Sequence, residues 1–389
     1  VGNPIMHHLA LGIDPTPLGS APFVLATDES VTGLASDLDL DLPAAAFYVG
    51  PCIAGHVGAD TAAAILAEGP HRSEAIQLLV DIGTNAEIVL GDRTHQYAAS
   101  SPTGPAFEGA QISCGQRATA GAIEGVRIDR GTFEPTIKVI GTDVWSDDPG
   151  FAGALVSTGV TGVCGSGIID VVAEMFLAGL LDSDGTIRGA LAARTPRIVA
   201  DGRTYAYVLH DDNDFDDIGG EGGEGGSRLC ITQNDVRAIQ LAKAALRAGI
   251  DLLVEHAGSP EVADIRLAGA FGAHIDPVHA MVLGLVPDCP IEGVRAVGNA
   301  AGTGAVQALL SRRLRAEMEA AARDVTKIET ATEPRFQELF VAAMALPHAT
   351  ASSPHLATVV ELPERSPVAA SSRGGRRRRS ERARVMDGV

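Results

Sequence analysis

The sequence has 389 residues, carries a net charge of −19, and is 46% hydrophobic. That length allows two lobes with a large buried core, and an aromatic content of only 4% predicts that aliphatic side chains fill it. No apolar run approaches the roughly 20 residues that a membrane-spanning helix needs, and so acidic a body disfavours nucleic acid as a general ligand.

The charge is unevenly distributed along the chain. Residues 373–384 contain seven Arg and one Glu, so this segment carries +6 and the remainder carries −25. A solvated, disordered tail over 349–389 is the favoured interpretation, because this part is rich in Pro, Ser and Ala. An electrostatic contact with an acidic partner or nucleic acid is the alternative.

The five cysteines are dispersed, and no two have the spacing of metal or cluster ligands. They therefore predict a reducing, cytoplasmic location and no iron–sulfur cluster in this chain. These residues are Cys52, Cys114, Cys164, Cys230 and Cys289.

Helices and strands are expected to alternate along the chain. The longest helix is predicted over 232–257, with Thr232 as N-cap and Asp235 in the first turn, where a carboxylate favours the helix dipole. The other expected elements are, in order, helix 5–12, strand 45–49, helix 59–68, three strands within 78–99, helices 114–125 and 167–181, a strand and glycine turn within 265–272, a helix from 278, helix 302–315 and a terminal element at 336–344.

The glycine-rich run at 219–226 invites a phosphate-loop interpretation. The surrounding segment, 211–226, contains no Lys and several Asp and Glu residues, which would repel phosphate. A flexible insertion is the favoured interpretation.

Residues 79–91 carry the most informative motif. An apolar strand runs into Asp81, the chain turns through Gly83, Thr84 and Asn85, and a second strand leaves through residues 88–90. Such a tip brings backbone N–H groups, a hydroxyl and an amide together around a glycine, as phosphate-binding turns do. Asp81 is placed to bind a hydrated divalent cation or to cap the turn, and an ordinary β-hairpin is the alternative.

A second strand ends in a glycine turn nearly two hundred residues downstream, over 265–272. This turn resembles the adenosine-binding turn of the acetate and sugar kinase, heat-shock chaperone and actin superfamily (ASKHA). The resemblance implies that Gly269, Ala270 and Gly272 flank adenine and ribose, whereas Phe271 fits the core better than an adenine platform. The order and spacing of the two turns agree with that superfamily.

Further blocks narrow the resemblance to the C-terminal ATPase part of the reductive activators of corrinoid proteins, over residues 1–348. The resemblance implies an α/β, two-lobed ASKHA fold with an incomplete first lobe at 1–75 and a second lobe at 76–348. The family's N-terminal ferredoxin-like domain and the first phosphate hairpin have no counterpart here, which suggests a fragment. The blocks lie at 52–61, 100–110, 164–170, 231–237 and 298–305.

The resemblance also implies an activity. ATP hydrolysis, with Mg²⁺, would drive reduction of cob(II)alamin to cob(I)alamin in the corrinoid protein of a methyltransferase system, with electrons from a ferredoxin-like donor. Homodimerisation is left open. A small-molecule kinase on the same fold and an inactive nucleotide-binding module are the alternatives.

The candidate site residues follow from these motifs. Asp81 is the first candidate for catalysis and for magnesium through water, and Glu108, in a Gly- and Pro-rich loop, is a second ligand or a plain loop residue. Glu87 could reach the cleft by two-residue alternation or face solvent. Gly165 and Ser166 precede a helix whose N–H groups could bind an anion, with Ser166 as N-cap the favoured single role. The remaining nucleotide candidates are Gly83, Thr84, Asn85, Gly269, Ala270 and Gly272.

Overall fold

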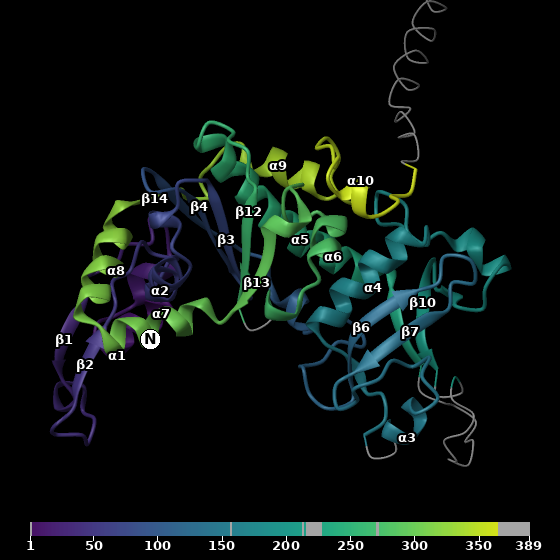
Figure 1. The fold of residues 1–389 in the computed structure, drawn as a ribbon, viewed down its shortest axis with the longest axis horizontal. Helices are drawn as coiled ribbons and strands as arrows, with labels where there is room; N and C mark the ends of the chain where they lie inside the picture. The colour runs from purple at the N-terminus through teal and green to yellow at the C-terminus, as the bar shows by residue number, and fades with distance from the viewer. Residues whose placement is uncertain (1, 156–157, 212–213, 215–227, 270–271, 365–389) are drawn as a thin grey trace, which may run out of the picture.

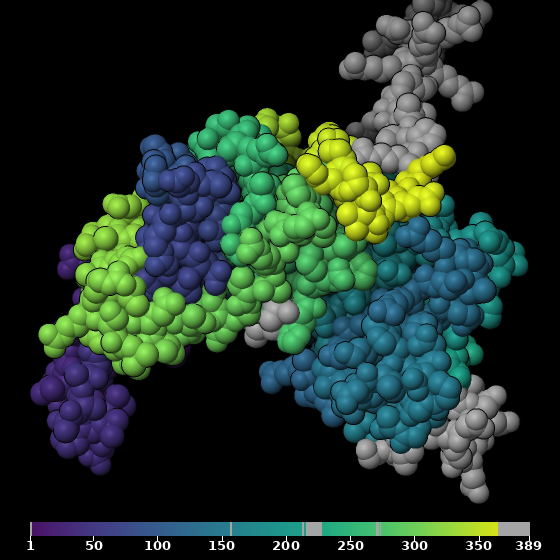
Figure 2. Space-filling model, in the orientation of Figure 1, coloured from purple at the N-terminus to yellow at the C-terminus, as the bar shows by residue number. Residues whose placement is uncertain are grey.

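The computed structural model describes residues 2–155, 158–211, 214, 228–269 and 272–364. A mixed α/β architecture surrounds one central sheet (Figure 1). Helices α2, α7 and α8 lie on one side of this sheet, and α5, α6 and α4 lie on the other. A short antiparallel hairpin of β1 (Val31–Leu34) and β2 (Ala46–Val49) projects from the body at the lower left (Figure 2).

The central sheet has six strands in the order β13-β12-β3-β4-β5-β14. Strands β3, β4 and β5 form an antiparallel meander, and β12, β13 and β14 join its two edges as parallel partners. The strands are β3 (Gln77–Ile82), β4 (Ala86–Gly91), β5 (Gln96–Ser101), β12 (Asp264–Ala268), β13 (Val294–Gly298) and β14 (Val325–Lys327).

Both faces of this sheet are buried. Alternate side chains point to opposite sides of a strand, so each strand contributes to two cores. Leu78 and Val80 belong to a large core with α5 (Gln233–His256), whereas Leu79 packs with Ile65 of α2 (Ala59–Glu68). Helix α5 starts after Thr232, the predicted N-cap, which forms a capping box with Asp235.

Helices α2 and α7 (Ala300–Leu310) pack closely, and α8 (Arg312–Asp324) completes this group with α1 (Pro4–Ala10) nearby. The close approach depends on Gly304, where an added Cβ would collide with the carbonyl oxygen of Ala63. The packing therefore joins residues 59–68 to residues 300–324 across the predicted lobe boundary at 75.

A second group of elements extends from the opposite side of the sheet. Helix α4 (Gly165–Leu177) packs on β6 (Ala122–Ile128) and on α6 (Pro277–Leu283). The other elements of this part are β7 (Pro135–Val139), α3 (Phe151–Leu155), β8 (Gly162–Val163), β9 (Ile198–Asp201), β10 (Thr204–Asp211) and β11 (Arg228–Thr232).

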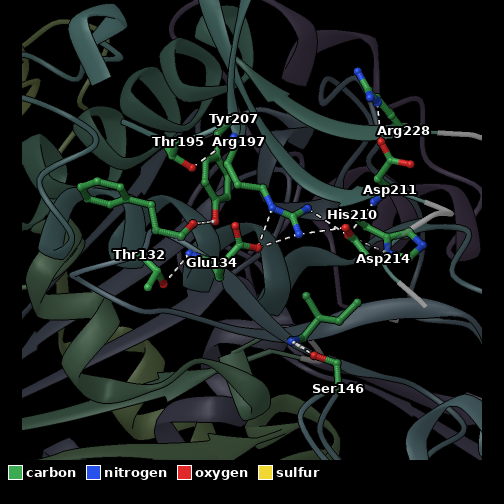
Figure 3. A network of polar contacts seen from close by, with 12 residues as sticks. Thr132, Glu134, Ser146, Thr195, Arg197, Tyr207, His210, Asp211, Asp214 and Arg228 are labelled. Atoms are coloured by element: carbon green, nitrogen blue, oxygen red, sulfur yellow. Dashed lines mark hydrogen bonds and ion pairs between the residues drawn. The ribbon is translucent and has the colours of Figure 1, made fainter. Parts of the chain in front are cut away.

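A network of polar contacts joins the two small sheets of this group (Figure 3). The guanidinium of Arg197, just before β9, donates to Glu134, just before β7, and to both carboxylate oxygens of Asp214, at 2.8–2.9 Å. The Tyr207 hydroxyl of β10 donates to the carbonyl of Phe133 at 2.9 Å. The planar fork of Arg197 therefore fixes how these sheets meet.

Most predicted elements are confirmed, including the meander, α2 with its start after Gly58, and α5. The element predicted at 336–344 is helix α9 (Phe336–Ala343), but a further short helix follows it. The helix predicted over 114–125 is wrong. Residues 122–128 form strand β6, in which Val126 and Ile128 are buried and Arg127 between them is exposed. The helix expected over 302–315 is two helices, α7 and α8, divided at Ser311, whose hydroxyl accepts from the Leu314 N–H.

The predicted tail must be corrected at its start. Residues 349–364 are placed in the structure, and Leu356 of α10 (Leu356–Val359) is buried in the main core. The arginine-rich part and most of the glycine-rich insertion fall on residues 365–389, 212–213 and 215–227, which lie outside the described residues. Within the part that the structure describes, no helix is long and apolar enough to cross a membrane.

The contact at Gly304 predicts that one added methyl group at this position destabilises the protein. Gly304→Ala should lower the free energy of unfolding by about 1–3 kcal/mol, because the methyl group would push α7 away from α2. Urea denaturation measures this change. Gly153→Ala in α3 is the matched control, since a Cβ there meets nothing within 4 Å. Equal stabilities of the two variants would contradict the packing argument.

Candidate functional site

A cleft of about 490 Å³ lies where strands β3 and β12 end. It lies between the β3–β4 hairpin and the N-terminus of α4, so it is formed by segments far apart in sequence. Its lining residues are Asp81, Ile82, Gly83, Phe107, Glu108, Gln116, Arg117, Ala118, Cys164, Gly165, Ser166, Gly269 and His274.

A row of polar side chains crosses the sheet beside this cleft. Asp81 of β3 lies directly opposite Glu87 of β4, which lies opposite Ser100 of β5. The Ser100 hydroxyl donates to Glu87 Oε1 at 3.4 Å. This row faces α2, because Leu79, two residues before Asp81, and Val89, two residues after Glu87, pack with that helix. Two carboxylates thus share the space beneath α2.

The carboxylates of this row are protonated more readily than usual. Burial, followed by the charge of Asp60 in the first turn of α2, raises the pKa of Asp81 to about 6. Burial and the charges of Asp60 and Asp81 raise the pKa of Glu87 to about 8. Burial also raises the pKa of Asp60. Like charges directly opposite one another repel, so this region favours a bound proton or cation.

The tip of the hairpin is held by the loop that follows β5. The Gly83 N–H donates to the Asn85 carbonyl at 3.1 Å, and the Thr103 hydroxyl donates to the carbonyls of Gly83 and Thr84. The Thr84 hydroxyl donates to Glu108 Oε1 at 2.6 Å. These bonds join the hairpin to η4 (Pro105–Glu108), so Glu108 and Thr84 act as a pair.

The glycine turn after β12 comes close to Asp81. Gly269 has a φ of +98°, which favours glycine, and a Cβ there would lie 2.8 Å from Asp81 Oδ1 and 2.8 Å from the Ile82 carbonyl oxygen. The Gly269 N–H donates to the Gly298 carbonyl at 2.9 Å. Only glycine lets this turn approach the hairpin so closely.

Helix α4 begins at the edge of the cleft. Its N-cap is Cys164, which provides no side-chain cap, so the favoured assignment of Ser166 as N-cap is wrong. The Ser166 hydroxyl donates instead to the Glu124 carbonyl on β6 at 2.8 Å. Ser166 therefore fixes the helix start to β6 and leaves the first N–H groups without a side-chain acceptor.

A partly buried histidine joins α4 to α6, the helix that follows the glycine turn. His279 Nδ1 lies 2.6 Å from Asp170 Oδ1, and Nε2 lies 3.1 Å from Glu174 Oε1. Burial alone would lower the pKa of His279, but the bonds to the two carboxylates raise it to about 10. A charged imidazolium thus connects two sides of the cleft.

The structure brings most of the predicted residues together, but not all. Thr84 reaches Glu108, whereas Asn85 lines a separate cavity of about 340 Å³ with His56, Ser100 and Glu329. Gly272 is buried against Leu267, and Ala270 and Phe271 lie outside the described residues. Asp81, Gly83, Glu108, Gly165, Ser166 and Gly269 all line the cleft.

Sequence reasoning missed three residues at this site. Asp60 lies in the block at 52–61 but was assigned no role, because no local sequence signal shows that the start of this helix lies close to the hairpin at 79–91. Gln116 and Arg117 fell in a segment that was predicted to be helical. The available signal for Arg117 was a cation in the segment between Gly115 and Gly121 of a chain with a net charge of −19.

Comparison with known families assigns the chain. Residues 75–357 match the model of the C-terminal domain of RACo, the ASKHA domain, and residues 1–73 match the RACo middle region. The reductive activator for corrinoid, iron–sulfur protein is a similar solved structure, with a TM-score of 0.75 and 32% identity, covering 89% of this chain and 52% of that one. The two-lobed ASKHA fold is thereby confirmed.

Two curated relatives are also similar. The corrinoid activation enzyme RamQ of Eubacterium limosum is 37% identical over 347 residues, which are 87% of this chain and 54% of RamQ. The [Co(II) methylated amine-specific corrinoid protein] reductase of Methanosarcina barkeri is 28% identical over 61% of this chain and 40% of that protein. The chain thus spans about half the length of RamQ, and less of the reductase.

The buried acidic row predicts that stability depends on pH through Glu87. Because the pKa of Glu87 is raised to about 8, its contribution to stability is full below its ordinary pKa and is lost as the pH rises through 8. Glu87→Gln should remove this loss and stabilise the ligand-free protein at pH 8.5 by on the order of 2–4 kcal/mol.

Thermal unfolding between pH 5 and 8.5 tests this. Glu261→Gln, at an exposed position, is the control and should follow the wild type. A Glu87→Gln protein with the same pH profile as the wild type would show that Glu87 does not titrate in this range.

The contact between α4 and α6 predicts that loss of its cation destabilises the protein. His279→Gln leaves Asp170 and Glu174 without a buried cation and should cost about 3–5 kcal/mol. The wild-type contribution is full below pH 6.5 and is lost as the pH rises through about 10. Denaturant unfolding at pH 6 and 9.5 measures both effects, with exposed His95→Gln as control. An equally stable variant at pH 6 would exclude a charged His279.

Proposed function

We propose that this chain, which belongs to the RACo family of reductive activators of corrinoid proteins, binds and hydrolyses ATP to activate a corrinoid protein. The observation that supports this best is the close approach of the two turns, with Gly269 against Asp81 at one end of the cleft. A nucleotide lying there would have its adenosine at the glycine turn and its phosphates at the hairpin.

Phosphoryl transfer to water needs positioning and charge stabilisation rather than a covalent nucleophile. Asp81 lines the cleft at the end of a buried strand, so it can orient a water molecule. Glu108 lies next to the hairpin through its bond to Thr84, which places a second carboxylate on the same side. We assign Asp81 the main role and Glu108 a supporting one.

The donors of the cleft are compatible with Mg²⁺ bound through water. Among the described residues, no group of three or more His, Cys, Asp or Glu side chains is arranged to hold a metal ion directly. An ion carried by the phosphates would instead contact Asp81 through its hydration shell, as Mg²⁺ keeps several waters. When bound, the ion neutralises charge on the phosphates. The repulsion among Asp60, Asp81 and Glu87 favours a cation there.

The proposal also includes a partner and an electron donor. RamQ is named a corrinoid activation enzyme, and we propose a corrinoid protein of a methyltransferase system as the partner here. We propose a ferredoxin-like domain or protein as the electron donor, because the dispersed cysteines lack the spacing of iron–sulfur cluster ligands. The five free cysteines suit a cytoplasmic location.

Asp81→Asn should lower ATP hydrolysis by about 100-fold or more while ATP binding persists, because the amide cannot act as the carboxylate does. Phosphate release measures turnover, and titration calorimetry measures binding. Asp92→Asn, in the exposed turn between β4 and β5, is the control. Near-normal turnover of Asp81→Asn would remove Asp81 from the mechanism.

The proposed activity predicts a visible change in the corrinoid. With a ferredoxin-like donor and reductant, cob(I)alamin should form in a corrinoid protein only when this chain and ATP are both present. The absorbance spectrum of the corrinoid follows the reaction, and omission of ATP is the control. ATP turnover without any spectral change, together with phosphorylation of an added small molecule, would instead favour a kinase.

A further inference from the structure

One cation stands out in the cleft. Asp81 and Glu108 line it with negative charge, and Arg117 is the one Arg or Lys among its lining residues. The Arg117 side chain is exposed, and none of the described residues forms an ion pair or hydrogen bond with its guanidinium. The guanidinium is therefore available to a ligand in the cleft.

The backbone of Arg117 is held in place although its side chain is not. The N–H of the preceding residue, Gln116, donates to the Val163 carbonyl at 2.9 Å, and Gly115 packs against the Gly109 carbonyl. The Gln116 side chain contacts the Thr161 hydroxyl at 3.0 Å. These contacts fix Arg117 beside β8, which leads directly into α4.

The same side of the cleft carries a second source of positive potential. The first N–H groups of α4, at Gly165, Ser166 and Gly167, have no side-chain cap, and a helix of 13 residues gives that end a partial positive charge. A ligand that spans the cleft would therefore meet carboxylates near the hairpin and the free guanidinium of Arg117 near the N-terminus of α4. The arrangement suits a polyanion with a cation at one end.

We infer that Arg117 binds the phosphates of the nucleotide and makes the cleft select nucleoside polyphosphates over nucleosides. The inference rests on the proposed function, and it adds a residue that determines specificity. A guanidinium presents N–H donors in a planar fork that fits two phosphate oxygens, whereas lysine offers a point charge. The cleft would prefer nucleoside polyphosphates because adenosine has no phosphate oxygens for the guanidinium to bind.

Titration calorimetry of the chain with ATP, ADP and adenosine, each with Mg²⁺, tests the inference. Arg117→Ala should weaken ATP binding by about 10- to 100-fold and leave adenosine binding unchanged. Arg117→Lys should fall between Arg117→Ala and the wild type for ATP. Arg130→Ala is the matched control, since Arg130 is also exposed but does not line the cleft.

The outcomes separate this inference from the proposed function. Wild-type binding of ATP with no loss in Arg117→Ala would overturn the role of Arg117 alone. Equal losses for ATP and adenosine would assign Arg117 to the base or the ribose and also overturn it. A wild-type chain that binds none of the three ligands would overturn the nucleotide proposal and this inference together.

Discussion

The burial of the central sheet on both faces constrains the rest of the structure. Helix α5 covers one face and α2 covers the other, so every side chain on β3 and β4 must enter one of two cores. Because side chains alternate along a strand, the alternation that points Leu79 and Val89 at α2 also points Asp81 and Glu87 there. Two carboxylates opposite each other are costly in such a place, and the raised pKa values of both groups express that cost.

The helix over this row connects it to the rest of the molecule. Asp60 lies in the first turn of α2 and adds its charge to the pair, while the far side of α2 packs on α7 through Gly304. Across the cleft, His279 ties the helix after the glycine turn to α4. Groups at the cleft are thus joined to helices on both sides of the sheet by contacts that a change of one methyl group or one charge would disturb.

The sequence was sufficient to predict the strands and turns that form the cleft, because the hairpin at Asp81 and the turn at Gly269 carry local signals. The sequence could not predict contacts between residues far apart in the chain. Examples are the charge of Asp60 close to Glu87, and His279 between Asp170 and Glu174. The segment 114–125 was predicted as a helix because apolar residues at 118, 122 and 123 fit a helical period. Residues from 122 onward instead form a strand, because they pair with β7. Ser166 was misassigned because the N-cap is Cys164, two residues earlier, and a helix start cannot be located that closely from sequence.

These features give the proposed hydrolysis a physical means of acting on a partner. A cation carried by nucleotide phosphates would relieve the repulsion among Asp60, Asp81 and Glu87, and Asp60 belongs to α2. The relief would depend on the charge present, so under the proposed hydrolysis the ATP and ADP states would differ in how strongly α2 is held to the hairpin. A ligand can shift a conformational equilibrium only by its differential affinity for the two conformations. Since α2 packs closely on α7, that difference would reach the surface of α7, where Leu309 and Leu310 are exposed.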